Sequence, residues 1–351
     1  MLRTPAKTTT VHPQRPLLTI AVPTYNRAGD LSRLLDALQR ELAGQQHRVG
    51  LVIANNASTD HTAAVIERFA SLWQGVQVVT QSINVGMDGN FCTCAEAVNG
   101  EFFWIMGDDD LPVPGAIRML LDLLDEERPD LVGLSSRWVR NIDDAATDAL
   151  SGPLRYVRLS CDDFGRRLHV WTTFLTGMIV RRAPLLDDPL AVRKFAGTHL
   201  SQMSWIMDRL REGHKFIHVE TPCVLATAGG SGGYSVVKVF GQHFPRIVRD
   251  SLASTQRERR LARAIVLRTM LAYLPNLLWD LRHARIGDFQ PENITEALRP
   301  QLGSHPLTVL ILLPIGRLPQ PAARLVLKIA SGLARVTAAI DRLRARKRPA
   351  S

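Results

Sequence analysis

The chain of 351 residues has few cysteines and no long hydrophobic run, and these absences exclude several classes of protein. Its four cysteines are too few for a disulfide framework, and the spacing of Cys92 and Cys94 is too short for a CxxC redox or zinc motif. We expect the cysteines to be packing residues in a reducing compartment. The longest apolar run, residues 307–315, falls far short of the ~20 residues that cross a bilayer, so we expect no transmembrane helix.

Two further features are missing near the N-terminus. Residues 1–16 are polar and basic without an apolar core, so we expect a disordered arm and not a signal peptide. The turn TYNR (24–27), which follows the first predicted strand, has neither the Walker nor the dinucleotide glycine pattern. This absence argues against an ATPase or a dehydrogenase. It also argues against a sugar nucleotidyltransferase, which would carry glycines with Arg or Lys there.

Positive charge is concentrated at the C-terminus. The net charge is +10, and residues 301–351 contribute +8 of it through nine Lys/Arg and one acid. The remainder is nearly neutral and gives no reason to expect a nucleic-acid-binding face. Within residues 322–343, apolar and basic positions recur at helical spacing, which predicts a basic amphipathic helix. The apolar positions are Leu325, Ile329, Leu333, Val336 and Ile340, and the basic ones are Arg324, Lys328, Arg335 and Arg342.

A basic amphipathic helix of this kind suits an anionic membrane surface. We therefore expect residues 301–351 to place the protein peripherally on a membrane. The alternative is a solvated helix that packs on the rest of the chain or pairs with another subunit, which would make the protein a homo-oligomer.

Strands alternate with helices every 25 to 30 residues over the first 135 residues, which predicts an α/β fold with a doubly wound, mostly parallel sheet. The predicted strands are 17–23, 49–54, 76–80, 102–105 and 131–134. Beyond residue 135 the pattern is less regular, with a strand expected at 174–180, a helix at 201–211 and a flexible loop at 229–233. From about residue 255 the chain reads as helical and basic. We expect an α/β domain over residues 17–250 and a helical extension over 251–351.

Three adjacent carboxylates, Asp108, Asp109 and Asp110, follow the apolar run 102–105. Adjacent carboxylates repel one another, so a folded protein keeps such a cluster chiefly where a divalent cation neutralises it. Mg²⁺ and Mn²⁺ prefer oxygen ligands and usually bridge protein carboxylates to phosphate oxygens. The alternative is a solvated acidic turn that caps the next helix.

Polar side chains follow three of the predicted parallel strands, at the edge where ligands of open α/β sheets bind. An aromatic ring, amide groups and carboxylates together suit a nucleotide diphosphate with a cation on its phosphates. The three groups are Thr24, Tyr25 and Asn26, then Asn55, Asn56 and Asp60, and then Asp108, Asp109 and Asp110.

Four motifs in this order resemble the nucleotide-sugar domain of glycosyltransferase family 2, which has the GT-A fold. They are VPTYNR (22–27), NNASTD (55–60), NVGMDGN (84–90) and GEFFWIMGDDD (100–110). The resemblance covers about residues 17–135, the nucleotide-sugar half, and extends more weakly to about 225 within an acceptor half, 136–250. The glycine-rich residues 229–233, with Tyr234 and Lys238 after them, could close over the diphosphate, and the alternative is an ordinary mobile connection. The segment SGGYSVVKVFG (231–241) is also similar to a loop of bacterial O-antigen glycosyltransferases of the abequosyltransferase kind.

The resemblance implies roles at matching positions. Thr24 and Tyr25 would contact the base, and Asn56 stands where the family commonly has an Asp that reads it. Asp108 would contact the ribose or the sugar and border the metal, and Asp109 or Asp110 would hold Mn²⁺ or Mg²⁺. The alternative for Tyr25 is a packed aromatic residue. Asn26, Asn55, Asp60 and Asn84 complete the expected nucleotide set, although turn and cap chemistry is the stronger interpretation of Asn84.

The family's catalytic base is usually an Asp in a segment that corresponds to residues 195–202, which contains no Asp or Glu. We expect His199 to take the proton of the acceptor hydroxyl, because imidazole titrates near neutrality. The alternative is a structural histidine at a helix entry. Asp208, inside the predicted helix, is the second candidate. The missing carboxylate also leaves open a nucleotide-sugar-binding protein without catalysis.

The sequence therefore predicts a metal-dependent, inverting glycosyltransferase that uses a nucleotide-diphospho-sugar. We expect a glycan acceptor linked to polyprenyl diphosphate, in surface polysaccharide or O-antigen synthesis. The expected location is the cytoplasmic face of the bacterial plasma membrane.

Overall fold

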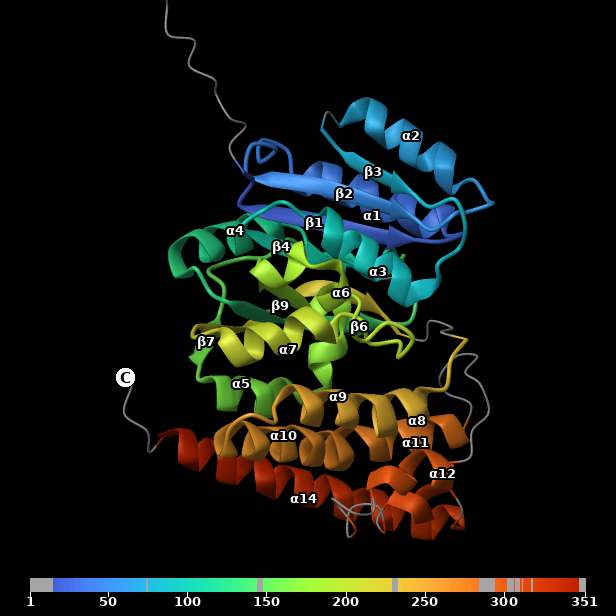
Figure 1. Cartoon of the computed structure of the whole chain (residues 1–351), viewed down its shortest axis with the longest axis vertical. Coiled ribbons are helices and arrows are strands. Elements are labelled where there is room, and N and C mark those ends of the chain that lie inside the picture. Colours follow the sequence, from blue (N-terminus) through green and yellow to red (C-terminus); the bar gives the residue numbers. More distant parts are fainter. Residues whose placement is uncertain are drawn as a thin grey trace, which may run out of the picture.

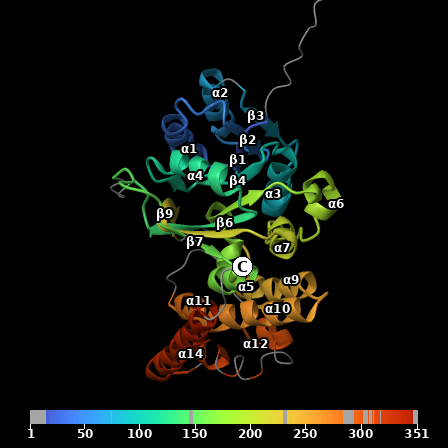
Figure 2. The same cartoon turned by 90° about the vertical axis from the view of Figure 1, so that its left-hand side faces the viewer.

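The computed structural model describes residues 15–73, 75–143, 148–228, 233–283, 294–301, 306, 310, 312–316 and 318–346. A nine-stranded sheet in the order β3-β2-β1-β4-β8-β6-β9-β5, with β7 paired to β9, forms its centre. The C-terminal helices stack against one side of this α/β part, with α14 farthest from β3 (Figures 1 and 2). The strands are β1 (Leu18–Thr24), β2 (Val49–Asn55), β3 (Gln77–Thr80), β4 (Phe102–Ile105), β5 (Leu111–Pro112), β6 (Leu131–Val139), β7 (Tyr156–Leu159), β8 (Met178–Arg181) and β9 (Phe216–Thr227).

The helices fall into two groups. Those of the α/β part are α1 (Ala28–Glu41), α2 (Thr62–Leu72), α3 (Gly86–Ala97), α4 (Ala116–Glu127), α5 (Cys161–Leu168), η1 (His169–Thr173), η2 (Leu175–Gly177), η3 (Pro184–Asp187), α6 (Pro189–Val192) and α7 (Met203–Glu212). Those that follow are α8 (Val236–Lys238), η4 (Val239–His243), α9 (Phe244–Ser251), α10 (Gln256–Arg268), η5 (Thr269–Tyr273), α11 (Leu274–Arg282), α12 (Ile294–Leu298), η6 (Arg299–Gln301), η7 (Leu313–Gly316) and α14 (Gln320–Arg346).

The first half of the sheet is parallel, as predicted. β1 pairs in parallel with β2 and β4, and β2 with β3. The side chains of β1 and β4 are buried, which explains why both strands are continuous apolar runs. The carboxyl ends of β1, β2 and β4 therefore meet at one edge of the sheet.

The second half is mixed, because β8 is antiparallel to both β4 and β6 while β9 is parallel to β6. We did not predict β5, β7, α5 or β9. The polar stretch Glu220–Pro222 interrupts β9 where its pairing with β6 shifts register, so the strand has no continuous apolar pattern. The strand expected at 174–180 begins only at Met178, because Leu175–Gly177 forms a 3₁₀ turn. The helix expected at 201–211 is α7.

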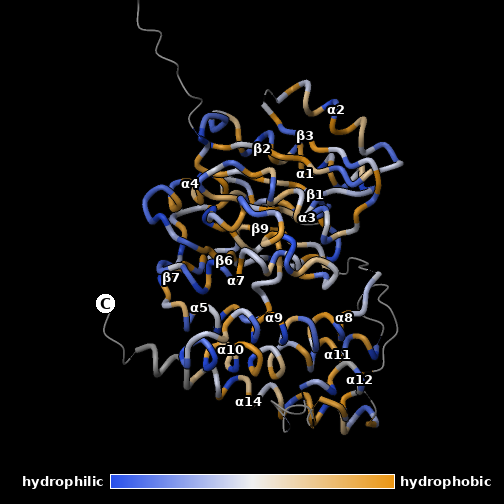
Figure 3. Tube along the Cα trace, in the orientation of Figure 1, coloured by the Kyte–Doolittle hydropathy of each residue, from blue (hydrophilic) through white to orange (hydrophobic). Residues whose placement is uncertain are grey.

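Hydrophobic side chains pack on both faces of the sheet. One cluster joins the strands to α1 and α4, and the other joins them to α3, α7 and the helices α9 to α11. Figure 3 shows hydrophobic residues both in the central strands and in the C-terminal helices. At Gly165 of α5, Leu261 and Ile265 of α10 approach so closely that an added Cβ would lie 3.0 Å from Ile265. The extension predicted for 251–351 thus shares a hydrophobic core with the α/β part. All four cysteines are free, and three of them are buried.

Helices α10, η5 and α11 form one continuous helix, Gln256–Arg282. By length and composition this helix of 27 residues could cross a membrane, although 61% of its most apolar window is buried inside the structure. This helix differs from our expectation of none, because Arg263 and Arg268 interrupt its apolar residues along the sequence. The helix contains a π-helical segment, η5, and a second one, η4, precedes α9. α14 is held against it through Arg268, which donates to the carbonyl of Ala334 at 2.7 Å.

Glu127, at the end of α4, anchors β7 to the sheet and provides a test of stability. Its buried carboxylate accepts hydrogen bonds from Arg158 and from the hydroxyl of Tyr156 (3.1 Å) and pairs with Lys215 (2.8 Å). These partners lower the pKa of Glu127 to about 2, so its ionised form stabilises the fold above pH ~4.5 and this contribution is lost as the pH falls towards 2. Glu127→Gln should reduce the free energy of unfolding by about 2 kcal/mol at pH 7.

The measurement is urea unfolding of wild type and Glu127→Gln at several pH values. The difference between them should shrink below pH ~4 as the wild-type carboxylate takes up a proton. Glu126→Gln, at the exposed neighbouring position, is the matched control and should unfold like the wild type. Equal stability of both variants at pH 7 would contradict the role of Glu127.

Candidate functional site

A cavity of about 530 Å³, which we call the strand-end cavity, lies at the edge where β1, β2 and β4 end. The structure brings most of the predicted site residues to it. Those that line it are Thr24, Tyr25, Asn56, Asn84, Asp108, Asp109 and Asp110. Thr24 and Asn56 are buried, while the ring of Tyr25 is 42% exposed and free to stack on a ligand. Asn90, for which turn and cap chemistry was the expectation, also lines the cavity, as do Arg27 and Thr176, for which we had predicted no role.

The three carboxylates differ in their surroundings. Arg27 places Nη1 2.5 Å from Asp109 Oδ2 and 3.3 Å from Asp108 Oδ1. Asp110 instead accepts from Thr176 Oγ1 at 2.5 Å and from the backbone N–H of Thr227 at 3.1 Å. Asp108, Asp109 and Asp110 form a loop that we call the acidic loop. Asp110 therefore connects the acidic loop to η2 and β9. Burial raises the pKa of Asp108 and of Asp110 to about 7, so these carboxyl groups require a nearby cation to be ionised at lower pH.

The arrangement fits a divalent cation through two carboxylates and not three. In the part of the chain that the structure describes, no group of three or more His, Cys, Asp or Glu side chains is placed to hold a metal ion. Mg²⁺ and Mn²⁺, however, are commonly held by one or two carboxylates together with waters and substrate phosphates. Asp108 and Asp109 share a single positive partner, Arg27, at the cavity wall. Each oxygen of Asp110 accepts a hydrogen bond from within the fold, from Thr176 and Thr227, so we assign the cation first to Asp108 and Asp109.

Asn56 organises the loop that precedes α3. Its Oδ1 accepts from the N–H of Val85 at 2.9 Å, and its Nδ2 donates to Asn84 Oδ1 at 2.8 Å. Asn84 Oδ1 also accepts from the N–H of Gly86. These contacts agree with turn chemistry for Asn84. They also mean that the Asn56 amide is bonded inside the protein at the position where it was expected to read a base.

Asn26, Asn55 and Asp60 lie behind the cavity and do not line it. Asn26 Oδ1 accepts from the N–H of Thr59 at 2.7 Å, and Asn55 Oδ1 accepts from the N–H of Ser58 at 3.1 Å. Asp60 accepts from the first backbone N–H groups of α1 and α2. The three side chains lock the two strand-end loops together, which fixes the turn that carries Tyr25. Their predicted contact with a nucleotide would thus be indirect.

A second cavity of about 460 Å³, which we call the aromatic cavity, adjoins the first. The two share several wall residues, which are Met87, Phe91, Phe174, Leu175 and Tyr234. His199 lines the aromatic cavity and stacks on Tyr234, with the ring centroids 4.8 Å apart. The predicted proton acceptor therefore stands close to the boundary between the cavities.

His199 is held from the opposite side by Asp88 of α3. The backbone N–H of His199 donates to Asp88 Oδ2 at 2.8 Å, and that of Ser201 donates to Asp88 Oδ1 at 3.0 Å. His199 has a left-handed backbone conformation, with φ of 59°, which these two bonds stabilise. We had not predicted a role for Asp88, because its partner is distant in sequence.

Asp208, the second candidate for the base, is not brought to either cavity. It lies on α7, and its Oδ2 accepts from Arg209 Nη2 at 2.8 Å. The position of Asp208 therefore gives no support to a catalytic role. Of the loop expected at 229–233, residues 229–232 lie outside the described residues.

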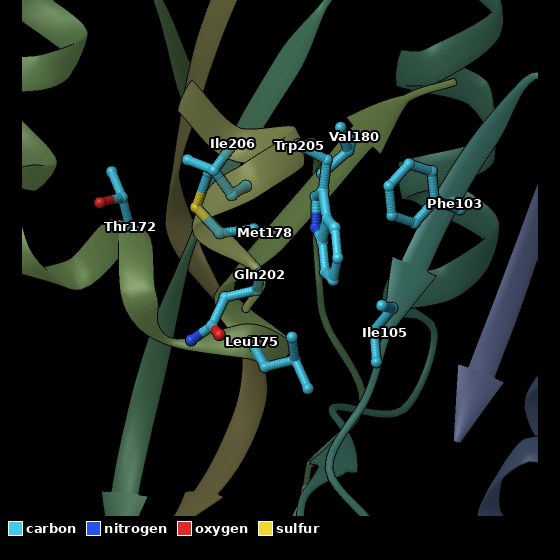
Figure 4. A pocket seen from close by; sticks show the side chains of 9 residues that line it. All are labelled: Phe103, Ile105, Thr172, Leu175, Met178, Val180, Gln202, Trp205 and Ile206. Atoms are coloured by element: carbon cyan, nitrogen blue, oxygen red, sulfur yellow. The ribbon is translucent and has the colours of Figure 1, made fainter. Parts of the chain in front are cut away.

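A small, mostly apolar void lies beside the end of β4 (Figure 4). Phe103 of β4 meets Trp205 of α7 edge to face, with the centroids 6.2 Å apart, and Ile105 ends β4 just before the acidic loop. The void between them is about 10 Å³, close to the minimum of roughly 10–15 Å³ that admits one water molecule. Gln202, which lines both this void and the aromatic cavity, donates from Nε2 to the carbonyl of Thr173.

Comparison with known proteins finds a family match for part of the chain. Residues 19–178 match the family described as Glycosyl transferase family 2. Over 112 residues the chain is 30% identical to an abequosyltransferase of Salmonella typhimurium, covering 32% of this chain and 33% of that protein. Over 169 residues it is 28% identical to an uncharacterized protein of Mycobacterium tuberculosis, covering 47% of each. The chain thus spans about a third to a half of the length of these curated relatives.

Solved structures resemble nearly the whole chain. TarS 1–349 of S. aureus, also solved in complex with UDP-GlcNAc, has a TM-score of 0.55 at 15% identity and covers 90% of this chain and 89% of its own. The mannosyltransferase PcManGT of Pyrobaculum calidifontis, solved with GDP-Man and Mn²⁺, has a TM-score of 0.51 at 17% identity and covers 92% and 87%. At these identities the likeness establishes the fold.

Proposed function

We propose that this protein transfers a sugar from a nucleotide-diphospho-sugar to a glycan acceptor, because residues 19–178 match glycosyltransferase family 2 and the chain has the fold of solved glycosyltransferases. The observation that carries the proposal is the pair of adjoining cavities. One has the Asp108–Asp109 carboxylates, and the other has His199 next to the shared wall. Such a pair can hold two substrates on either side of the bond to be made.

The strand-end cavity would bind the donor. Tyr25 would stack on the base, and Asp108 and Asp109 would hold Mn²⁺ or Mg²⁺ against the diphosphate. A bound divalent cation would neutralise charge that develops on the departing diphosphate. Arg27 would then break at least one of its ion pairs with Asp108 and Asp109 and bind a phosphate oxygen instead. Phosphate is also a good partner for a guanidinium group.

The aromatic cavity would bind the acceptor. A neutral imidazole of His199 would take the proton from the acceptor hydroxyl as its oxygen bonds to the anomeric carbon and the bond to the diphosphate breaks. Attack from the face opposite the leaving group gives inversion. Asp88 would keep His199 in position through the two backbone hydrogen bonds, with no direct part in the proton transfer.

The experiment is a screen of UDP-, GDP-, CDP- and dTDP-sugars with and without Mn²⁺. A ligand stabilises the fold by mass action, so the matching donor with Mn²⁺ should raise the melting temperature. The same mixture should slowly release nucleoside diphosphate. Stabilisation without release would favour the alternative of a non-catalytic nucleotide-sugar-binding protein. Absence of both for every donor would refute the proposed function.

We also infer that the acceptor is lipid-linked, as polyprenyl diphosphate carriers are, and that α14 holds the enzyme on the inner face of a bacterial plasma membrane during O-antigen or surface polysaccharide synthesis. The support is an exposed apolar row on α14. Leu325 is 59% exposed and Val336 57%, with Ile329 and Leu333 between them. Lys328 and Arg335 are exposed beside this row. The side chains of Ile340 and Arg342 lie outside the described residues.

Removing the apolar row should weaken membrane binding. We expect Leu325→Gln with Ile329→Gln to lower the fraction of protein that sediments with anionic vesicles at least fivefold, because both side chains would lose contact with the acyl boundary. Neutral vesicles and high salt, which screens the basic side chains, are the controls. Sedimentation equal to wild type would contradict membrane contact. Loss of a dimer in the variant, seen by light scattering, would indicate that the row pairs two subunits instead.

A further inference from the structure

The aromatic cavity has a composition that identifies its ligand more closely. Both tryptophans in its described lining are partly exposed, Trp138 at 45% and Trp171 at 43%. Their ring centroids are 5.8 Å apart, and Trp138 also lies 4.9 Å from the ring of Phe174. A folded protein that leaves two large aromatic faces uncovered beside each other in a cavity usually presents them to a ligand.

The C-terminal helices supply a further part of the wall. Phe240 comes from the π-helical segment η4 and Tyr273 from the π-helical segment η5, and their rings meet at 5.2 Å. Tyr273 also meets Trp171 at 5.7 Å, so the aromatic series is continuous across the cavity. π-Helical turns are rare and concentrate at functional sites. Both segments are placed where their turns direct a ring towards this cavity.

In the part that the structure describes, the lining has a single group that can carry a positive charge, His199. None of the described residues that line the aromatic cavity is Asp, Glu, Lys or Arg. While His199 is neutral, an ionised carboxylate or phosphate in this cavity would lose its hydration without gaining a charged partner, which is costly. Its other polar groups are few and neutral. Gln202 is buried, and its Oε1 has no hydrogen-bond partner within the described structure.

From these observations we propose that the aromatic cavity binds a neutral sugar ring of the acceptor, with its C–H face stacked on Trp138 and Trp171. The attacking group must be a hydroxyl near His199 at the shared wall, so a sugar fits this position and an isoprenoid chain does not. The volume lies within the range of roughly 300–1,000 Å³ found for small-molecule sites. A charged acceptor sugar, such as a hexuronic acid, is excluded from this place. The proposal rests on the proposed function for its assignment to the acceptor.

The test is a titration of the full-length protein, without nucleotide, by methyl glycosides of neutral hexoses, 6-deoxyhexoses and hexuronic acids, with farnesol as the lipid probe. Saturation-transfer NMR and tryptophan fluorescence report binding. At least one neutral glycoside should bind, with its C–H protons saturated most strongly, and at least tenfold more tightly than hexuronic acids. Trp138→Ala or Trp171→Ala should weaken it at least tenfold, whereas Trp138→Phe, which keeps an aromatic face, should stay within threefold.

The control is Trp73→Phe, because Trp73 stacks on Phe69 in the other hydrophobic cluster and should not affect the titration. Binding of no neutral glycoside, equal binding of hexuronic acids, or displacement of the glycosides by farnesol at lower concentration would each overturn the proposal. Donor hydrolysis by the same preparation is measured separately. Hydrolysis without glycoside binding would refute this inference alone. Glycoside binding without hydrolysis would refute the enzymatic assignment and would still support the sugar site.

Discussion

Asp109→Asn should reduce kcat/KM for nucleoside diphosphate release about a thousandfold at saturating Mn²⁺. The expected loss is large because Asp109 is partly exposed to the cavity and is therefore available to a cation. Its ion pair is with Arg27, which also pairs with Asp108. An amide in its place removes one negative oxygen from the position where a cation would meet the diphosphate. The measurement is product release together with calorimetry of Mn²⁺ binding in the presence of nucleotide.

Two variants separate this loss from general damage. Asp122→Asn alters a carboxylate of α4 that is 58% exposed and pairs with Arg48, so it should leave turnover unchanged. Asp110→Asn should act differently from Asp109→Asn, because Asp110 is bonded to Thr176 and Thr227. We expect it to lower stability more than Mn²⁺ affinity. Wild-type turnover in Asp109→Asn would contradict the assigned cation site.

His199→Ala should lower kcat at least a hundredfold and leave the KM of the donor within threefold of wild type. We expect kcat to change and the KM of the donor to stay, because His199 lines the aromatic cavity and not the strand-end cavity. It would act on the attacking hydroxyl without contact to the nucleotide. In the hydrolysis assay, a water molecule stands in for the acceptor. His199→Asp restores the carboxylate that the family usually has and should recover part of kcat.

His214→Ala is the control for His199→Ala, since His214 is an exposed histidine that lines neither cavity. A structural role for His199 predicts another result, in which kcat and KM change together with the melting temperature. That result, with no recovery in His199→Asp, would refute the assignment of His199 as the proton acceptor.

The parallel half of the fold could be predicted because its three inner strands, β1, β2 and β4, are buried on both faces. β1, β2 and β4 are therefore continuous apolar runs, and the polar residues that follow them necessarily share one edge. The family resemblance rested on those same strand ends and is confirmed by the match over residues 19–178. Thr24, Tyr25, Asn56 and the acidic loop were placed correctly at one cavity for this reason.

The remainder depends on contacts between distant segments. The bulge in β9 hides its alternation, and Leu175–Gly177 is apolar in composition but 3₁₀ in conformation. Arg27 and Asp88 bear no local mark of their roles, since each meets its partners only after folding. One signal for Arg27 was available. It is a basic residue at the end of one predicted strand, and three carboxylates follow another strand of the same sheet. The rings of the aromatic cavity come from many separate segments and form no pattern along the chain.

The histidine at position 199 has an electrostatic consequence that a carboxylate would not have. A carboxylate starts negative and becomes neutral on accepting a proton, whereas imidazole starts neutral and becomes a cation. The aromatic cavity, with no ionic side chain in its described lining, would therefore be uncharged while the acceptor enters. Positive charge would arise only as the glycosidic bond forms, beside a leaving group whose negative charge is growing. The two charges would appear together and attract each other across the wall that the cavities share.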